Sequence, residues 1–233
     1  MKAVRILFLV LLAASAAAQT EPWLEVSSEV IDFGYVPQNS MVLAELIIKS
    51  NFDDTLKIDR IETFYDGIVI TPQKAVLLPG DTLRLKYKLF TSRFIGKKMW
   101  GTRIYSNENI GLRKITVMAH VFGRDPNFRT VTTEPYIINA SQFGDKGPDE
   151  FEYKIINLTD EFIPLRLLYA DTTFFDLQFP VYIEPDSEAE GKIVLNDLGK
   201  KSDFEETITF EFINDKSEAY NFSIPIRRKI FKP

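Results

Sequence analysis

Apolar and polar side chains alternate strictly through residues 82–90. One face of this stretch carries leucine and tyrosine, and the other carries a basic stripe of Arg84, Lys86 and Lys88. A period of two residues is typical of a half-buried β-strand. The preceding residues 79–81 read Pro-Gly-Asp, in which proline presets φ and glycine accepts a positive φ. The sequence therefore predicts a tight turn followed by a strand.

Similar short strands, separated by turn signals, are expected through the first half of the chain. Asp66 and Gly67 predict a hairpin between two of these strands. No stretch shows a sustained 3.6-residue apolar period, so we expect little or no helix. Short strands with frequent turns are typical of an immunoglobulin-like sandwich. The strand ranges expected from the pattern are 23–26, 30–34, 41–49, 55–65, 68–70, 82–90, 99–105 and 112–122.

The same plan recurs in the second half of the chain. Pro79 and Pro185 are 106 positions apart, as are Asn51 and Asn157, and other landmarks keep nearly the same offset. A constant offset over independent landmarks indicates a duplicated module. We predict an all-β protein of two tandem immunoglobulin-like antiparallel β-sandwiches, with modules at 22–123 and 128–233 and a polar linker at 123–127.

Residues 1–18 predict a secretory signal peptide. Lys2 and Arg5 precede an apolar run, and small residues at 16–18 form a cleavage site before Gln19. An uncleaved membrane anchor is the alternative, but the apolar run is short for a span. We expect a periplasmic or secreted protein without a membrane span in the mature chain. It is not expected to be a lipoprotein, because no cysteine lies at the cleavage site.

Composition narrows the chemistry. The chain has no cysteine, which excludes zinc–thiolate sites, iron–sulfur clusters and cysteine nucleophiles. Its net charge is −5, and loss of Lys2 and Arg5 makes it two units more negative. An acidic chain without a basic block argues against nucleic-acid binding. Aromatic residues make up 13% of the chain, which favours pleated, half-buried surfaces.

One motif carries a family resemblance. Asp32, Phe33, Gly34 and Val36 resemble the opening of hydin-like, or major-sperm-protein-like, immunoglobulin modules found in secreted bacterial proteins. The resemblance covers residues 25–122 and is weak over 128–231. It implies a fold rather than a function. Members of the bacterial family often carry a cysteine pair after the third strand, and this chain has Tyr65-Asp66-Gly67 there, so a role tied to those cysteines does not transfer.

No residue set specifies a reaction. His120 is the sole histidine, so a two-histidine metal site is excluded and a surface or interface role is expected. Turn carboxylates suit Ca²⁺, but aspartate is also a common turn former. A glycosidase-like carboxylate pair needs only proximity in space, and stays open. We expect no enzyme activity and no cofactor. The turn carboxylates are Asp53, Asp54, Asp145, Asp149, Glu150, Asp197 and Asp203.

Several residues are candidates for partner binding. Outward cations on a strand commonly protect a sheet edge, and the basic stripe is alternatively a docking face for an acidic partner. Its counterpart in the second half is acidic, with Glu188 and Glu190, a contrast that can bring modules or copies together. Met118 and Phe122 face outward, and are covered by the second module or form a binding edge. The candidate partner-binding residues are Arg84, Lys86, Lys88, Asn107, Asn109, Met118 and Phe122.

These observations favour a non-enzymatic interaction or structural module of the bacterial cell envelope. It would bind a protein partner through sheet edges or loops, because a strand can add to an exposed edge. The alternative is a periplasmic chaperone of the PapD type, which donates a strand; Thr116, Met118, His120 and Phe122 form a short version of one. A carbohydrate-binding or glycosidase-like protein is the third interpretation.

Overall fold

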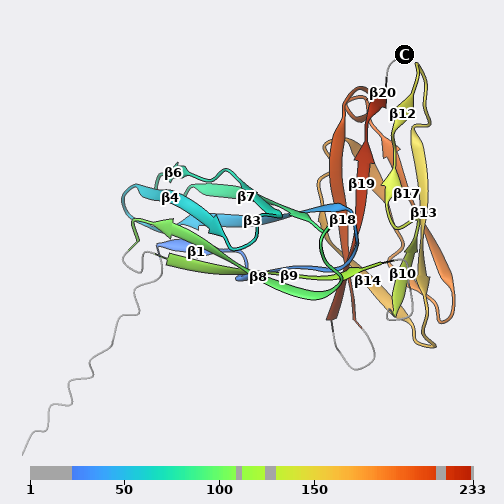
Figure 1. Ribbon diagram of the computed structural model, residues 1–233, viewed down its shortest axis with the longest axis horizontal. Coiled ribbons are helices and arrows are strands. Elements are labelled where there is room, and N and C mark those ends of the chain that lie inside the picture. The colour runs from blue at the N-terminus through green and yellow to red at the C-terminus, as the bar shows by residue number, and fades with distance from the viewer. Residues whose placement is uncertain (1–22, 109–111, 124–129, 214–218, 232–233) are drawn as a thin grey trace, which may run out of the picture.

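The computed structural model describes residues 23–108, 112–123, 130–213 and 219–231. The predicted signal peptide, most of the predicted linker and Asn109 lie outside these residues. Within them the chain is built of β-strands with one 3-10 turn, η1 (Gly199–Lys201), as expected from the absence of a helical period (Figure 1).

Within the described residues, nine strands precede the linker and eleven follow it. The first set is β1 (Leu24–Val26), β2 (Val30–Pro37), β3 (Met41–Ser50), β4 (Leu56–Thr63), β5 (Ile68–Thr71), β6 (Ala75–Leu77), β7 (Thr82–Phe90), β8 (Gly96–Ser106) and β9 (Leu112–Phe122). The second set is β10 (Val131–Glu134), β11 (Ile138–Asn139), β12 (Gln142–Phe143), β13 (Glu150–Asn157), β14 (Ile163–Ala170), β15 (Phe175–Gln178), β16 (Tyr182–Ile183), β17 (Glu188–Leu195), β18 (Phe204–Ile213), β19 (Ala219–Arg228) and β20 (Ile230–Phe231).

The two sets repeat one topology. One sheet of the first set has the order β1-β3-β7-β5, and its counterpart has the order β10-β13-β17-β15. The facing sheets run β2-β9-β8-β4-β6 and β19-β18-β14-β16, with β11 beside β19. In both sets the last long strand pairs in parallel with the short strand near the start. The duplication predicted from sequence offsets is therefore confirmed as two immunoglobulin-like sandwiches.

The Pro-Gly turn has the expected backbone in both copies. Gly80 has φ +83°, and Asp186, which occupies the equivalent place after Pro185, keeps a positive φ of 47°. The aspartate accepts a conformation that non-glycine residues rarely adopt, because its neighbours reproduce the turn. Ser50 and Asn157 donate their backbone N–H groups to Asp81 and Ser187, respectively, at 2.9 Å.

Two expectations about pairing are wrong. Asp66 and Gly67 do not make a hairpin, because β4 pairs with β6 and β8 while β5 pairs with β7 in the other sheet. Edge protection by the basic stripe is wrong at Lys86 and Lys88, where β7 lies between β3 and β5, but β5 ends opposite Lys86 and does not reach Arg84. Period-2 alternation shows which face of a strand is buried, but not which strands flank it.

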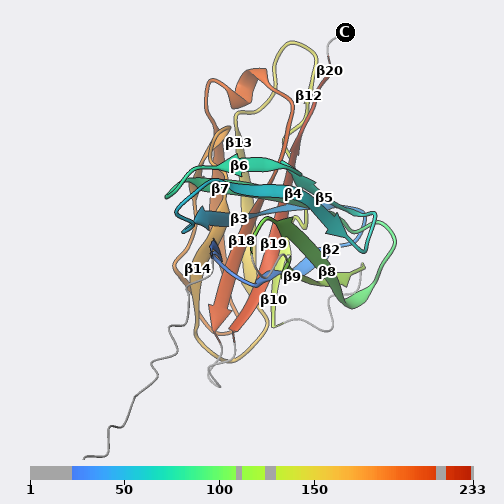
Figure 2. The same ribbon diagram turned by 90° about the vertical axis from the view of Figure 1, so that its left-hand side faces the viewer.

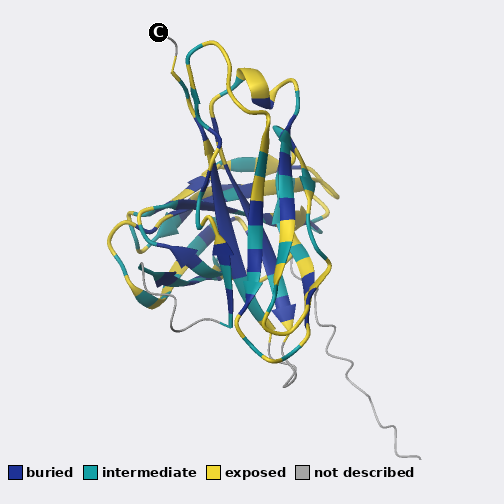
Figure 3. Ribbon diagram, turned by 90° about the vertical axis from the view of Figure 1, so that its right-hand side faces the viewer, coloured by how far each residue is buried: buried dark blue, intermediate teal, exposed yellow. Residues whose placement is uncertain are grey.

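Each sandwich has its own hydrophobic core. Phe33, Leu46 and Tyr87 are among the fully buried side chains of the first, and Phe175 and Phe210 of the second. The inward leucines of β7 belong to the first core, as the alternation predicted. Figure 3 shows buried residues concentrated between the sheets of the second module and on the strands facing the first.

The strands of the first module run crosswise to those of the second, and one end of the first module abuts the middle of β18 and β19 (Figures 1 and 2). The two sheets are continuous through one parallel bridge, Tyr35 with Phe222. The side chain of Tyr35 packs against the second core. The chain therefore folds with its modules joined by strand pairing as well as by the linker.

Gly34 makes this junction possible. It lies at an irregularity in β2, has φ +62°, and a Cβ built on it would lie 1.7 Å from the carbonyl oxygen of Asn221. The side chain of Asp32 accepts a hydrogen bond from the Gly34 N–H at 2.8 Å and holds the kink. Glycine inside a strand often marks a bulge or a close backbone approach, and here it marks both.

Side-chain hydroxyls and amides of the second module satisfy backbone groups of the first. Thr207 Oγ1 accepts a hydrogen bond from the Leu43 N–H at 2.8 Å, on a part of β3 that β1 does not reach. Ser223 donates to the Phe33 carbonyl at 2.7 Å, and Asn221 donates to the Asp32 carbonyl at 3.0 Å. Because backbone groups buried without partners are costly, these contacts stabilise the junction.

Gly34→Ala is expected to open this junction. The new methyl group meets backbone rather than a mobile side chain, so strand β19 has to move away. Adding the left-handed backbone penalty and the clash, we expect a loss of roughly 2–5 kcal/mol in the free energy of unfolding measured in urea. Small-angle scattering should show a larger radius of gyration.

Gly80→Ala is the matched control. Gly80 also has a positive φ, but nothing lies within 4 Å of its added Cβ. It should cost only about 1–2 kcal/mol and leave the scattering profile unchanged. Equal effects of the two substitutions would show that the close approach at Gly34 contributes nothing.

Candidate functional site

The middle residue of the basic stripe, Lys86, lies at the junction between the modules. Its ammonium group donates to Asp171 Oδ2 at 2.8 Å and lies 3.7 Å from Glu206 Oε1, both in the second module. The idea that the stripe brings modules together is supported at this residue, although its partners are not Glu188 and Glu190. An external partner at Lys86 therefore competes with Asp171 for the ammonium group.

Burial shapes the charges of this cluster. Glu206 is 4% exposed, and its Oε2 atom is buried without a hydrogen-bond partner among the described residues. Burial raises the pKa of the Glu206 carboxyl to about 7, although the Lys86 ammonium opposes the shift. Burial also disfavours the charge on Asp171, but hydrogen bonds from Lys86 and Thr173 hold its pKa below the usual value. Lys86 therefore neutralises one firmly ionised carboxylate and one that titrates near neutral pH.

Among the described residues, the other two members of the stripe make no ion pair with the second module. Arg84 is exposed and pairs with Glu45 on the neighbouring strand at 3.0 Å. Lys88 is half-buried, opposite Leu43 and Val69 in the sheet. A docking role for these two residues stays a prediction.

Asn107 acts within the first sandwich. Its side chain accepts a hydrogen bond from the Lys57 N–H at 2.8 Å and donates to the Thr55 carbonyl at 3.0 Å. These bonds tie the end of β8 to the start of β4. The Asn107 side chain therefore bonds within the first module, and its role in binding a partner stays a prediction. Asn109 lies outside the described residues.

Met118 and Phe122 face outward on β9, but the strand is not a sheet edge there. From Thr116 to Phe122, β9 pairs with β2 on one side and, at most of these positions, with β8 on the other. Phe122 packs edge-on against Tyr136, with ring centroids 5.4 Å apart. Burial of Phe122 against the second half of the chain is the interpretation that this contact favours. Met118 lines a separate hollow of about 230 Å³ with Asp32, Tyr35 and His120.

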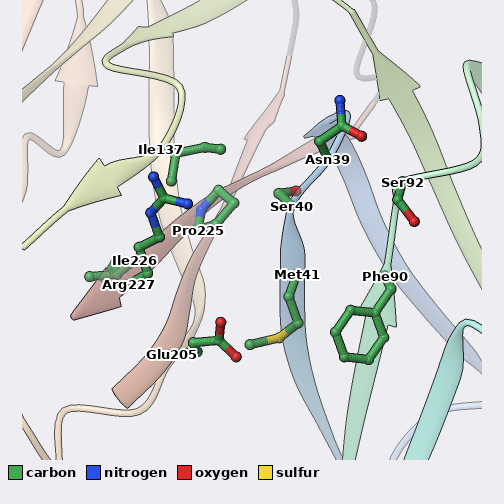
Figure 4. Close-up of a pocket in the computed structure, with 10 residues that line it drawn as sticks. All are labelled: Asn39, Ser40, Met41, Phe90, Ser92, Ile137, Glu205, Pro225, Ile226 and Arg227. Carbon is green, nitrogen blue, oxygen red and sulfur yellow. The ribbon is translucent and has the colours of Figure 1, made fainter. Parts of the chain in front are cut away.

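A cleft opens on another side of the junction. It has a volume of about 270 Å³ and takes apolar walls from both modules. In Figure 4, Met41 of β3 and Glu205 of β18 point toward one another across it, with Phe90 on one side and Arg227 on the other. The remaining lining residues are Asn39, Ser40, Ser92, Ile137, Pro225 and Ile226.

A second hollow neighbours the cleft. Phe90 and Ser92 line both, and the second, of about 220 Å³, adds Tyr65, Gly67 and Arg93. The Phe90 side chain is 40% exposed between them. We refer to these two neighbouring hollows at the end of β7 as the groove; Arg227 lines the first hollow and Arg93 lines the second.

Two carboxylates, Glu45 and Asp171, line a further hollow of about 590 Å³ beside the junction, where Glu45 pairs with Arg84 and Asp171 with Lys86. Among the described residues, no group of three histidine, aspartate or glutamate side chains is placed to hold a metal ion. The turn carboxylates have local partners: Asp149 pairs with Lys200 at 3.0 Å, and Asp203 accepts from the Ile230 N–H at 2.9 Å. The cleft and the hollow beside His120 are each lined by one carboxylate, Glu205 and Asp32, respectively.

The junction residues were missed from sequence, although signals existed. Gly34 interrupts a strand, and Thr207, Thr209 and Ser223 place hydroxyls on strand positions that alternate with apolar residues. All three hydroxyl residues are buried, and Thr209 and Ser223 are 2.8 Å apart. These strands bury one face in the core of the second module and the other against the first module. The small hydroxyl residues on the second of these faces bond backbone groups of the first module.

No protein-family model and no curated protein matches the sequence. The structure is similar to a PapD-like domain of human CEP192, with a TM-score of 0.40 and 9% identity over 53% of this chain and 100% of that one. A protein of unknown function from Porphyromonas gingivalis W83 has a TM-score of 0.39 and 12% identity, over 89% and 99%. The E. coli chaperone DraB has a TM-score of 0.35 and 13% identity, over 86% and 96%.

At these TM-scores the likenesses carry no functional conclusion. The resemblance to hydin-like modules stays a prediction, because no family match bears on it. In the part of the chain that the structure describes, no helix is long and apolar enough to cross a membrane.

Replacing Lys86 should weaken the junction more than replacing Arg84. Lys86→Met keeps the length of the side chain but leaves Asp171 and the buried Glu206 without a cation. We expect a loss of about 1–3 kcal/mol in urea unfolding, discounted for the partial exposure of Lys86. Arg84→Met breaks an exposed pair and should cost no more than about 1 kcal/mol. A larger loss of unfolding free energy for Arg84→Met than for Lys86→Met would contradict the conclusion that Lys86 is the member of the stripe that stabilises the junction.

The stability of the protein should fall as the pH rises through neutrality. Glu206 has a native pKa of about 7 against 4.5 for the free side chain, so the native state holds a proton that the unfolded state has released. Stability from this group is complete below pH 4.5 and lost as pH rises through about 7, by on the order of 3 kcal/mol.

Glu206→Gln tests the source of this slope. It should flatten the dependence of unfolding free energy on pH between 4.5 and 8, measured by urea titration at each pH. Glu205→Gln, one residue away and exposed, is the control and should keep the slope of the parent protein. A Glu206→Gln slope equal to that of the parent would place the titrating group elsewhere.

Proposed function

We propose that this chain is a non-enzymatic, secreted protein-binding module of the bacterial cell envelope, which holds an extended segment of a partner in the groove beside the junction. The observation that carries the proposal is that Phe90 and Ser92 line both hollows. An exposed aromatic side chain in a concave, mainly apolar wall is typical of an anchor point in protein recognition.

The groove has the features needed to hold a peptide. Met41, Ile137 and Pro225 supply apolar surface, and Arg227 and Arg93 offer guanidinium groups for backbone carbonyls or acidic side chains. Arg93 lies 3.7 Å from Asp66 and both are exposed, so this pair can open at little cost. The strand pairing and hydrogen bonds of the junction fix the two walls relative to one another, which lowers the entropic cost of binding.

Strand addition provides a second element of the same site. β5 pairs only with β7 among the described strands, so its outer backbone groups face away from the sheet. The Gly67 carbonyl, just before β5, accepts a hydrogen bond from the Phe90 N–H at 2.8 Å. A segment that lies in the groove can therefore continue along this edge with backbone hydrogen bonds.

The PapD-type alternative is weaker for this chain. The strand proposed as donor, from Thr116 to Phe122, already has partners on both sides. A carbohydrate-binding or glycosidase-like function is also less favoured. The cleft is lined by one carboxylate, Glu205, and in the hollow that has two, Glu45 and Asp171, each is already held in an ion pair. Periplasmic or secreted location rests on the predicted signal peptide.

The proposal is tested by affinity capture from cell-envelope fractions. Phe90→Asp places a charge in the groove without disturbing a core residue, and should reduce the recovery of the partner at least tenfold. Phe162→Asp is the matched control, since Phe162 is 55% exposed on the second module and lines neither hollow. It should capture the partner as the parent protein does.

Arg227→Glu gives an independent arm in the first hollow of the groove, and should weaken capture of the same protein. If the Phe90→Asp variant and the Arg227→Glu variant each recovered as much partner as the parent protein does, the groove would be ruled out as the binding site. Hydrolysis of glycans or retention on a glycan array by the parent protein would instead favour the carbohydrate interpretation.

A further inference from the structure

Soft metal ligands gather on the outer face of the hairpin formed by β8 and β9. The chain has four methionines and one histidine. Two of the methionines, Met99 and Met118, share this face with the histidine, His120. The flanking residues Val117, Ala119 and Val121 are buried in the core, so the alternation of β9 places Met118 and His120 on the opposite, outward side.

The register brings the three side chains within reach of one another. Met99 lies directly opposite Met118 in the antiparallel pair. Directly opposed residues have Cβ atoms about 4.5–5.5 Å apart. His120 follows Met118 by two residues on the same face, about 7 Å along the strand. These spacings allow two thioether sulfurs and one imidazole nitrogen to meet at a single ion above the sheet.

The three positions are open to solvent or to a hollow. Met99 is 71% exposed, which is unusual for an apolar side chain in the middle of a long strand. Met118 and His120 line the hollow of about 230 Å³ beside the junction. The His120 ring stacks on Tyr35, with centroids 4.7 Å apart, and this contact supports the ring from the side of β2.

The chemistry of this donor set selects one class of ion. Thioethers are soft, neutral ligands that favour Cu(I), and imidazole suits copper as well. Zinc prefers thiolate, imidazole and carboxylate ligands, and calcium and magnesium prefer oxygen. We propose that Met99, Met118 and His120 form a binding site for Cu(I), with Ag(I) as its non-redox analogue.

Two cations, Lys97 and Lys98, and one carboxylate, Asp32, line the hollow beside the site. Lys97 lies opposite His120, and Asp32 lies opposite Met118 on the other side of β9. Lys97 repels a bound cation and Asp32 attracts it. The site is therefore expected to bind a monovalent ion, and Lys97 should limit its affinity.

The test is a titration of the mature protein with Cu(I), kept reduced by ascorbate, in competition with a chromogenic Cu(I) chelator. One ion should bind per chain. Met99→Leu and Met118→Leu conserve side-chain volume, so they should leave the unfolding midpoint near that of the parent. Each should weaken Cu(I) binding at least tenfold, and His120→Gln should also weaken it. Lys97→Gln should strengthen it severalfold.

Met41→Leu is the matched control, because Met41 lines the cleft and not this face. It should bind Cu(I) as the parent does. With Ag(I), the methyl resonances of Met99 and Met118 should shift in the NMR spectrum while that of Met41 stays in place. Failure to compete for Cu(I), or unchanged affinity in the Met99→Leu, Met118→Leu double variant, would overturn the proposal.

Discussion

The contact of the Gly34 backbone with the backbone of Asn221 is the constraint on which the rest of the structure depends. A side chain at position 34 would occupy the space of the Asn221 carbonyl, so the two strands meet only because glycine lies there with a positive φ. This approach lets Tyr35 pair with Phe222 and lets Asn221 and Ser223 bond the carbonyls of Asp32 and Phe33. The junction is thus made of backbone groups that a lone sandwich would leave to water.

The same junction accounts for the site features around it. It covers part of the open edge of β3, where Thr207 takes the place of a neighbouring strand, and so manages an edge that would otherwise invite unwanted pairing. It excludes water from Glu206, which raises the pKa of that carboxyl and makes the ion pair with Lys86 consequential. It also sets Met41 against Glu205 across the cleft. The covered edge of β3, the raised pKa of Glu206 and the walls of the cleft therefore all depend on the contact between the two modules.

Sequence reasoning predicted the parts of this fold that depend on local pattern. Alternation identified β7 and its buried face, and the constant offset between Pro79 and Pro185 revealed the duplication. Sequence reasoning failed where the role of a residue depends on residues that are distant in the sequence and lie against it in the fold. Lys86 was placed on an outward face correctly, but nothing local indicates Asp171 as its partner, 85 positions away. The groove was not predicted, because its walls come from separate modules. Gly34 was noticed as part of a family motif, although its physical role is to admit the second module.

The duplication also explains why the two copies differ in chemistry at equivalent places. β8 and β9 occupy the same positions in the first module as β18 and β19 in the second. In the second module, the outer face of β18 and β19 lies against the first module. Hydroxyls on this face, such as those of Thr207 and Ser223, bond backbone groups of the first module. In the first module the face has no such cover over Met99. Hydroxyls there would have no backbone to bond, and thioethers, which need no hydrogen-bond partner, can remain exposed and meet an ion. Divergence between the copies therefore follows from which face each one buries.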